Sequence, residues 1–294
     1  MARKLKLLGV HGLGDQRHST WKEDWPRTIR EIFPVDGGLE LEFEFLEYDD
    51  IFAGADLSGW DVAAAVAKLG ASGIGSIFRR ERGVLGDIPH TIRWTAGYVV
   101  AWVQDEAFKR KTRKRVLDRI REVKPDVILA HSLGSLVTYN AISHTDATAA
   151  DVKPLLEKAT YVTFGSQINN PFVVRNLTNG RIQELPVAFW HHLYNEHDDV
   201  FTRPIRNWAW PKFRQTETPF DDEGIGDHAA ESYFRHRNTI DNVWRPLGAA
   251  RLGARDFTGV ARTMRGDPVP CGRAPRRRAV LVGINDYPNP RDRL

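Results

Sequence analysis

Val127–Val137 is the stretch that most restricts how this chain of 294 residues can fold. The run Val127–Ala130 is apolar and has the length of one buried strand. A hydroxyl, Ser132, and the small residue Gly134 follow at once, and then a second apolar run begins. A strand that turns sharply into a helix would hold Ser132 at the turn, with its hydroxyl directed out of the sheet. The simpler alternative is a buried strand followed by a helix that Ser132 caps.

The spacing of small residues around Ser132 favours the sharp turn. A nucleophile elbow has the pattern G-x-S-x-G, in which the serine lies on a strained turn between a strand and a helix. Here the first small position is Ala130 and the last is Gly134. Alanine is an acceptable variant, because crowding at that position requires only a small side chain.

A second glycine-rich turn follows the predicted strand Leu5–Val10, where the chain reads His11-Gly12-Leu13-Gly14. Gly12 and Gly14 would let the backbone turn tightly and leave the amide of Leu13 free to donate to an anion. The alternatives are an ordinary glycine turn or a weak phosphate loop. The turn lacks the Lys-Ser/Thr ending of a P-loop and the G-x-G-x-x-G spacing of a dinucleotide site.

Strand and helix patterns alternate along the chain, which predicts an α/β fold with a mostly parallel central sheet and helices on both faces. Expected helices are Trp21–Phe33, Trp60–Leu69, Ile92–Val103, Asp105–Val123, a segment after Ser132, and Ala229–Asn242. Expected strands are Leu5–Val10, Leu39–Tyr48, Val127–Ala130, Ala159–Gly165 and Val187–Tyr194. Within Leu39–Tyr48, apolar residues alternate with glutamates from Leu39 to Phe45, which indicates one wet face near a sheet edge.

Composition excludes several classes of protein. The net charge of +4 is too mild to indicate nucleic-acid binding, and no apolar run is long enough for a transmembrane helix. The single cysteine, Cys271, excludes a disulfide framework and a cysteine-based metal site, and it fits a reducing, cytoplasmic compartment. Histidine spacing typical of a metal site is absent as well, so we expect neither a metal nor another cofactor.

A catalytic serine requires an acid and a histidine as partners, and the sequence contains both after Ser132, first the acid and then the histidine. A serine hydroxyl needs a base to remove its proton and a third group to orient that base. Asp198 and Asp199 lie in the polar loop beyond the predicted strand Val187–Tyr194, and His228 comes later. The amides of Leu133 and Leu13 could together bind an oxyanion.

These residues also have structural interpretations. The two aspartates could cap a helix or lie in a solvated loop, and His228 could be a structural histidine. His191 and His192 fall inside an apolar strand, where we expect a structural role.

With these motifs in place, the chain from about Leu5 to Asn242 resembles the α/β-hydrolase superfamily, particularly its lipases and esterases. The matching stretches are Gly9–Gly14, Ala130–Gly134, Thr163–Ser166, Asn195–Val200 and Asp227-His228. The resemblance implies that Ser132 is the nucleophile, His228 the base and Asp198 the acid. Asp198 is preferred to Asp199 because Asp, any residue, then Val is frequent after this strand in the family.

Two segments have open interpretations. The insertion at residues 49–104 carries Trp94, Tyr98 and Trp102 at helical spacing, which fits either a lid beside an acyl pocket or two helices packed on the sheet. The basic run Lys109–Arg115 could attract an anionic membrane, a nucleic acid or another anion. A solvated helix face is the preferred interpretation, because no aromatic residues interleave the run to stack on bases.

Composition changes near Arg255. Residues 1–254 are expected to form the hydrolase-like domain, and 255–278 a Pro/Gly/Arg-rich linker. Residues 279–294 resemble the opening strand and loop of a caspase-like (metacaspase) domain, without that family's catalytic His and Cys. A caspase-like domain or another protein is therefore an expected partner.

The leading functional prediction is a serine hydrolase that cleaves a carboxylic ester, of a small molecule or a lipid, through an acyl-enzyme. A thioesterase, acyltransferase or amidase would use the same triad. A different class is a non-catalytic adaptor or sensor for a caspase-like domain.

Overall fold

The computed structural model describes residues 3–12, 19–33, 39–52, 64–65, 68, 90–198, 202–205, 210–222 and 228–252. The chain divides into two compact units, Met1–Gly253 and Ala254–Leu294, and all described residues belong to the first. The predicted linker at 255–278 and the caspase-like segment at 279–294 lie outside the described residues. So does most of the predicted helix Trp60–Leu69.

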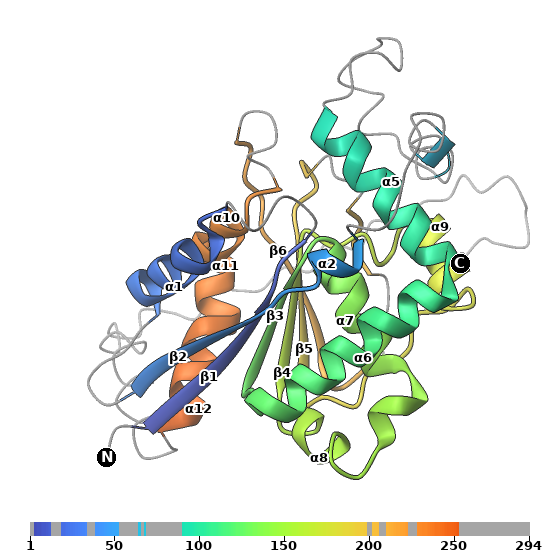
Figure 1. The fold of residues 1–294 in the computed structure, drawn as a ribbon. Coiled ribbons are helices and arrows are strands. Elements are labelled where there is room, and N and C mark those ends of the chain that lie inside the picture. The colour runs from blue at the N-terminus through green and yellow to red at the C-terminus, as the bar shows by residue number, and fades with distance from the viewer. Residues whose placement is uncertain are drawn as a thin grey trace, which may run out of the picture. The chain divides into compact units, whose positions relative to one another are not determined.

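A six-stranded parallel sheet forms the centre of the first unit (Figure 1). Its strands run side by side in the order β2-β1-β3-β4-β5-β6, and every neighbouring pair is parallel. Their bounds are β1 Arg3–Val10, β2 Leu39–Leu46, β3 Val127–His131, β4 Thr160–Phe164, β5 Phe189–Tyr194 and β6 Phe213–Glu217. The predicted parallel α/β architecture is thereby confirmed at the level of a general α/β fold.

Strand burial follows the sequence pattern. All five residues of β3 are buried, as expected for a strand in the middle of a parallel sheet. The alternating strand β2 lies at one edge, and most of its residues are partly exposed. The opposite edge strand, β6, was not predicted, since Arg214, Gln215 and Glu217 break its apolar pattern.

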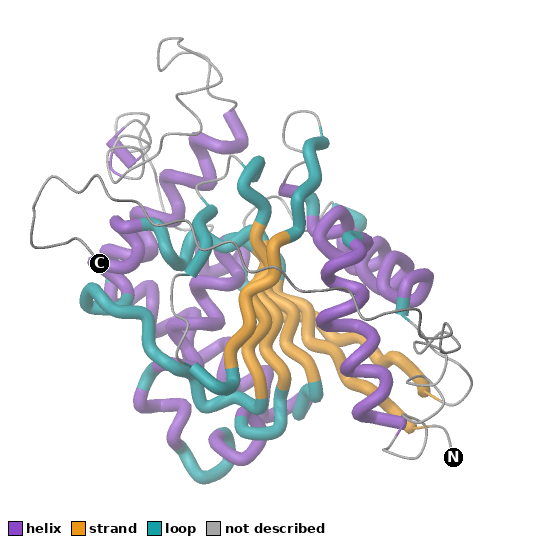
Figure 2. The backbone as a smooth tube through the Cα atoms, turned by 180° about the vertical axis from the view of Figure 1, so that it is seen from behind, coloured by secondary structure: helices purple, strands orange, loops and turns teal. Residues whose placement is uncertain are grey.

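Helices cover both faces of the sheet, and Figure 2 shows the two layers from behind. One face packs against α1 (Trp21–Ile32), α10 (Ala230–Arg235), the π-helical turn Ile240–Trp244 and α12 (Arg245–Leu252), with the short α11 (Arg237–Thr239) between them. The other face packs against a second set of helices. These are α2 (Asp49–Phe52), α5 (His90–Gln104), α6 (Glu106–Val123), α7 (Leu133–Ser143), the 3-10 turn Thr145–Thr148, α8 (Lys153–Leu156) and α9 (Pro171–Leu177).

The predicted helices α5 and α6 are core elements where they are described. Val99, Trp102 and Val103 of α5 are buried in the hydrophobic core, and the Trp102 indole donates to Thr112 of α6 over 2.9 Å. This part of α5 fits the helix-on-sheet interpretation. The lid prediction for the rest of 49–104 concerns residues that are largely outside the described part of the chain.

Acidic partners compensate several cations of the basic run on α6. Arg113 pairs with Asp146 and Glu106, and Arg115 forms a bidentate pair with Asp50. These pairs tie α6 to its neighbours and support the interpretation of the run as a helix face.

The chain order across the sheet reverses at β1 and β3. From β1 the chain moves outward to β2, and it then returns to the other side of β1 to form β3 and the remaining strands. In open α/β sheets, ligands bind beyond the carboxyl ends of the strands at such a switch point. The turn after β1 begins with His11-Gly12, and the turn after β3 holds Ser132, so both motifs singled out from the sequence lie there.

Candidate active site

Ser132 lies at a sharp turn between β3 and α7. Its backbone has φ 52° and ψ −130°, in a region that non-glycine residues rarely adopt. The surrounding structure holds this conformation. The Ser132 amide donates to the carbonyl of Phe164 over 3.1 Å, and the Ser132 carbonyl accepts from the amide and the hydroxyl of Ser135 over 2.9 and 2.5 Å. The Ser132 side chain makes no capping bond to α7, which argues against the Ser-capped helix.

Close backbone packing explains the small residues around the turn. A Cβ on Gly134 would lie 2.5 Å from the carbonyl oxygens of both Val10 and His11. A Cβ on Gly12 would lie 2.7 Å from the Cβ of Ser132. The glycines therefore let the start of α7 and the turn after β1 approach each other directly. The hydroxyl of Tyr48 donates to the His11 carbonyl over 2.5 Å and fixes the same turn.

Asp198 and His228 form a hydrogen-bonded pair beyond the carboxyl end of β5. Nδ1 of His228 lies 3.0 Å from Oδ1 and 2.8 Å from Oδ2 of Asp198. A carboxylate can only accept, so Nδ1 carries the proton and Nε2 of the neutral ring keeps its lone pair. Nε2 is buried and has no hydrogen-bond partner within the described residues. A buried polar atom without a partner is rare in native proteins and is a reason to look for function.

Tyr233 of α10 supports the same carboxylate. Its hydroxyl donates to Oδ2 of Asp198 over 2.7 Å, and its side chain is fully buried. The Asp198 side chain is buried too, so its charge depends on these donors for stabilisation.

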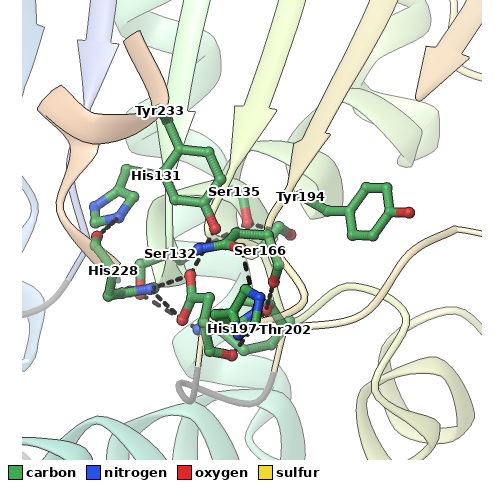
Figure 3. Close-up of polar contacts among 12 residues, drawn as sticks. His131, Ser132, Ser135, Ser166, Tyr194, His197, Thr202, His228 and Tyr233 are labelled. Carbon is green, nitrogen blue, oxygen red and sulfur yellow. Dashed lines mark hydrogen bonds and ion pairs between the residues drawn. The ribbon is translucent and has the colours of Figure 1, made fainter. Parts of the chain in front are cut away.

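His131 connects His228 to the turn that holds Ser132, and Figure 3 shows His131, Ser132 and His228 close together. Nε2 of His131 donates to the backbone carbonyl of His228 over 2.9 Å, and the two rings lie 4.6 Å apart. A Cβ on Gly165, at the end of β4, would meet Cε1 of His228 at 2.9 Å and Nε2 of His131 at 3.0 Å. The His228 ring therefore packs directly against the strand end beside Ser132.

Burial sets the charge of the neighbouring histidines. Desolvation lowers the pKa of His11 to about 4 and the pKa of His131 well below its usual range. Both rings are therefore neutral at pH 7, and they pack among Trp25, Phe164 and each other. Neither ring adds a positive charge beside His228.

Gln167 is a contact of Ser132 that the sequence analysis did not identify. Its Nε2 donates to Oγ of Ser132 over 3.4 Å, and both side chains are buried. The only sequence signal for it is its position just after the strand Thr160–Phe164 and the Gly165-Ser166 pair.

The remaining predicted residues divide into two groups. The Leu133 amide is the first of α7, where the helix provides no carbonyl for it, so it can donate to a ligand. Leu13 and Asp199 lie outside the described residues.

In the described part of the chain, no group of three or more His, Cys, Asp or Glu side chains is placed to hold a metal ion. No helix there is both long and apolar enough to span a bilayer.

No protein-family model, curated protein or solved structure matches this chain significantly.

Proposed function

We propose that this protein is a serine hydrolase of the α/β-hydrolase type that cleaves a carboxylic ester, with Ser132 as nucleophile, His228 as base and Asp198 as the orienting acid. The observation that carries the proposal is the strained turn at Ser132 beside an Asp198–His228 pair whose Nε2 is buried without a described partner. The order Ser, Asp, His along the chain is the order of α/β-hydrolases.

The proposed reaction begins with proton transfer from Oγ of Ser132 to Nε2 of His228. Oγ then attacks the ester carbonyl, and a C–O bond forms while the carbonyl oxygen becomes an anion. As the anion collapses, the bond to the alcohol breaks, and the alcohol leaves with the proton from Nε2. Water repeats the sequence on the acyl-enzyme and releases the carboxylic acid. Asp198 holds the ring by its bonds to Nδ1 and stabilises the positive charge that forms on it.

The oxyanion would be stabilised at the amino end of α7. The Leu133 amide directly follows Ser132, and the aligned peptide dipoles of α7 favour negative charge at this end. The amide of Leu13 is the proposed second donor, because Gly12 packs against the Ser132 side chain. One such donor contributes on the order of 3 kcal/mol to transition-state stabilisation.

Hydrolysis of 4-nitrophenyl esters of increasing chain length tests the proposal. We expect turnover by the wild type and a loss of about 1,000-fold or more in Ser132→Ala and His228→Ala. Ser143→Ala is the matched control, because Ser143 ends α7 away from the site, and it should keep wild-type turnover. Hydrolysis of thioesters or amides, but not of esters, would change the proposed substrate class. A folded wild type without turnover on any panel member would favour the adaptor or sensor for a caspase-like domain.

A further inference from the structure

We infer that the side-chain amide of Gln167 is a third oxyanion donor and therefore a catalytic residue. This inference rests on the proposed function and extends it to a residue outside the triad and the two backbone amides. The initial observation is the contact from Nε2 of Gln167 to Oγ of Ser132 over 3.4 Å. Only 1% of Gln167 and 3% of Ser132 is exposed to solvent, so the contact lies in a site largely closed to water.

Hydrogen bonds on both sides fix the backbone of Gln167. The hydroxyl of the preceding residue, Ser166, lies 2.6 Å from the Ser135 hydroxyl and accepts from the Ile168 amide over 3.2 Å. The Gln167 carbonyl accepts from the Asn170 amide over 2.8 Å. Asn170 is itself fully buried and caps α9 by accepting from the Phe172 amide over 3.0 Å.

This segment is therefore tied to both α7 and α9. Ser135 bridges the two parts of the site, because its one hydroxyl contacts both the Ser132 carbonyl and Ser166. The backbone that carries Gln167 is thus fixed before substrate binds, and its side-chain amide lies beside the nucleophile, an arrangement that favours the preorganisation electrostatic catalysis requires.

The length of the contact fits a transition-state role better than a ground-state role. At 3.4 Å the bond to Oγ is long for a hydrogen bond and contributes little to holding the hydroxyl. When Oγ attacks, the charge develops on an oxygen of the same carbon that Oγ has joined. A donor already close to Oγ needs only a small shift to reach that oxygen, and catalytic hydrogen bonds are often long before substrate binds.

The test compares Gln167→Met with the wild type in hydrolysis of 4-nitrophenyl butyrate. Methionine has a similar length and no donor, so we expect kcat/KM to fall about 100-fold, mostly through kcat, because the bond is gained in the transition state. The inhibition constant of butylboronic acid, which forms a tetrahedral adduct on serine, should weaken by a similar factor. Gln183→Met is the matched control: it removes an exposed glutamine that donates to the Ser143 carbonyl, and it should keep wild-type kcat/KM.

Two measurements keep the inference falsifiable. Thermal melting establishes that Gln167→Met is folded. A crystal structure of the wild type phosphonylated by a fluorophosphonate should place a phosphonyl oxygen within hydrogen-bond distance of Nε2 of Gln167. A folded Gln167→Met with wild-type kcat/KM, or an adduct whose phosphonyl oxygens lie away from Gln167, would overturn it. If Ser132→Ala keeps wild-type turnover, the proposed function itself fails, and the two failures are thereby distinguished.

Discussion

The hydroxyl of Tyr233 donates to Oδ2 of Asp198, the same oxygen that lies 2.8 Å from Nδ1 of His228. The Asp198 carboxylate is thus held by Tyr233 of α10 and by His228 at once. Because Tyr233 also packs its ring against Phe164 at the end of β4, the position of Asp198 is coupled to the core under the site.

Tyr233→Phe should lower both stability and activity. The substitution keeps the ring and removes one donor from a buried carboxylate, which we expect to cost about 1–3 kcal/mol in the free energy of unfolding. Looser support of Asp198 should lower kcat about tenfold with little change in KM. Urea unfolding and ester hydrolysis measure the two effects. Tyr139→Phe is the control. The hydroxyl of the buried Tyr139 accepts from the backbone amide of Gln183, so its loss should lower stability and leave kcat unchanged.

Replacement of the two neighbouring aspartates separates their roles. Asp198→Asn should lower kcat about 1,000-fold or more, because an amide no longer stabilises the positive ring of His228 and can stabilise the wrong tautomer. Asp199→Asn should stay within about threefold of the wild type, as an isosteric change outside the pair. The opposite order of the two rates would assign the acid to Asp199.

Gly134→Ala should disrupt the turn on which Ser132 lies. The added methyl would be 2.5 Å from two backbone carbonyl oxygens, and neither can move without shifting β1 or its turn. We expect a loss of roughly 3 kcal/mol in the free energy of unfolding, at the upper end for overpacking. Gly180→Ala is a useful comparison, because Gly180 has φ +86° and open space around it. Its cost should be only the backbone term of about 1–2 kcal/mol, with hydrolysis unchanged.

Stability should fall between pH 7 and pH 5 through the buried histidines. Burial lowers the pKa of His192 to about 4, below its value in the unfolded chain. In this pH range the unfolded chain binds the proton and the folded protein does not, so acid favours unfolding, by about 2 kcal/mol for this one group. Urea titrations at both pH values should show a smaller loss for His192→Gln than for the wild type. An equal loss in both proteins would remove His192 from this account.

The sequence predicted the four interior strands and the edge strand β2, and it missed the edge strand β6. Strands β1, β3, β4 and β5 are largely apolar and largely buried, and that pattern is visible without a structure. Strand β6 was missed because an edge strand can carry charged residues such as Arg214. His191 and His192 were expected to be structural, and both are buried in β5; His192 bonds the hydroxyl of Thr163.

The residues of the candidate site were also predicted only in part. Ser132 directly follows β3 and Asp198 lies in the loop after β5, so the parallel topology brings both to one edge of the sheet. Gln167 and Tyr233 each contact a residue 35 positions away, and nothing in their local sequence marks that contact. Such supporting residues depend on how α10 and the turn after β4 pack, which periodicity does not specify.

Fluorophosphonate labelling with mass-spectrometric mapping tests the central claim most directly. We expect a single phosphonyl group on the peptide that contains Ser132, no labelling of Ser132→Ala, and wild-type labelling of Ser143→Ala. An adduct on another residue, or equal labelling of Ser132→Ala and the wild type, would contradict the assignment of Ser132 as the nucleophile.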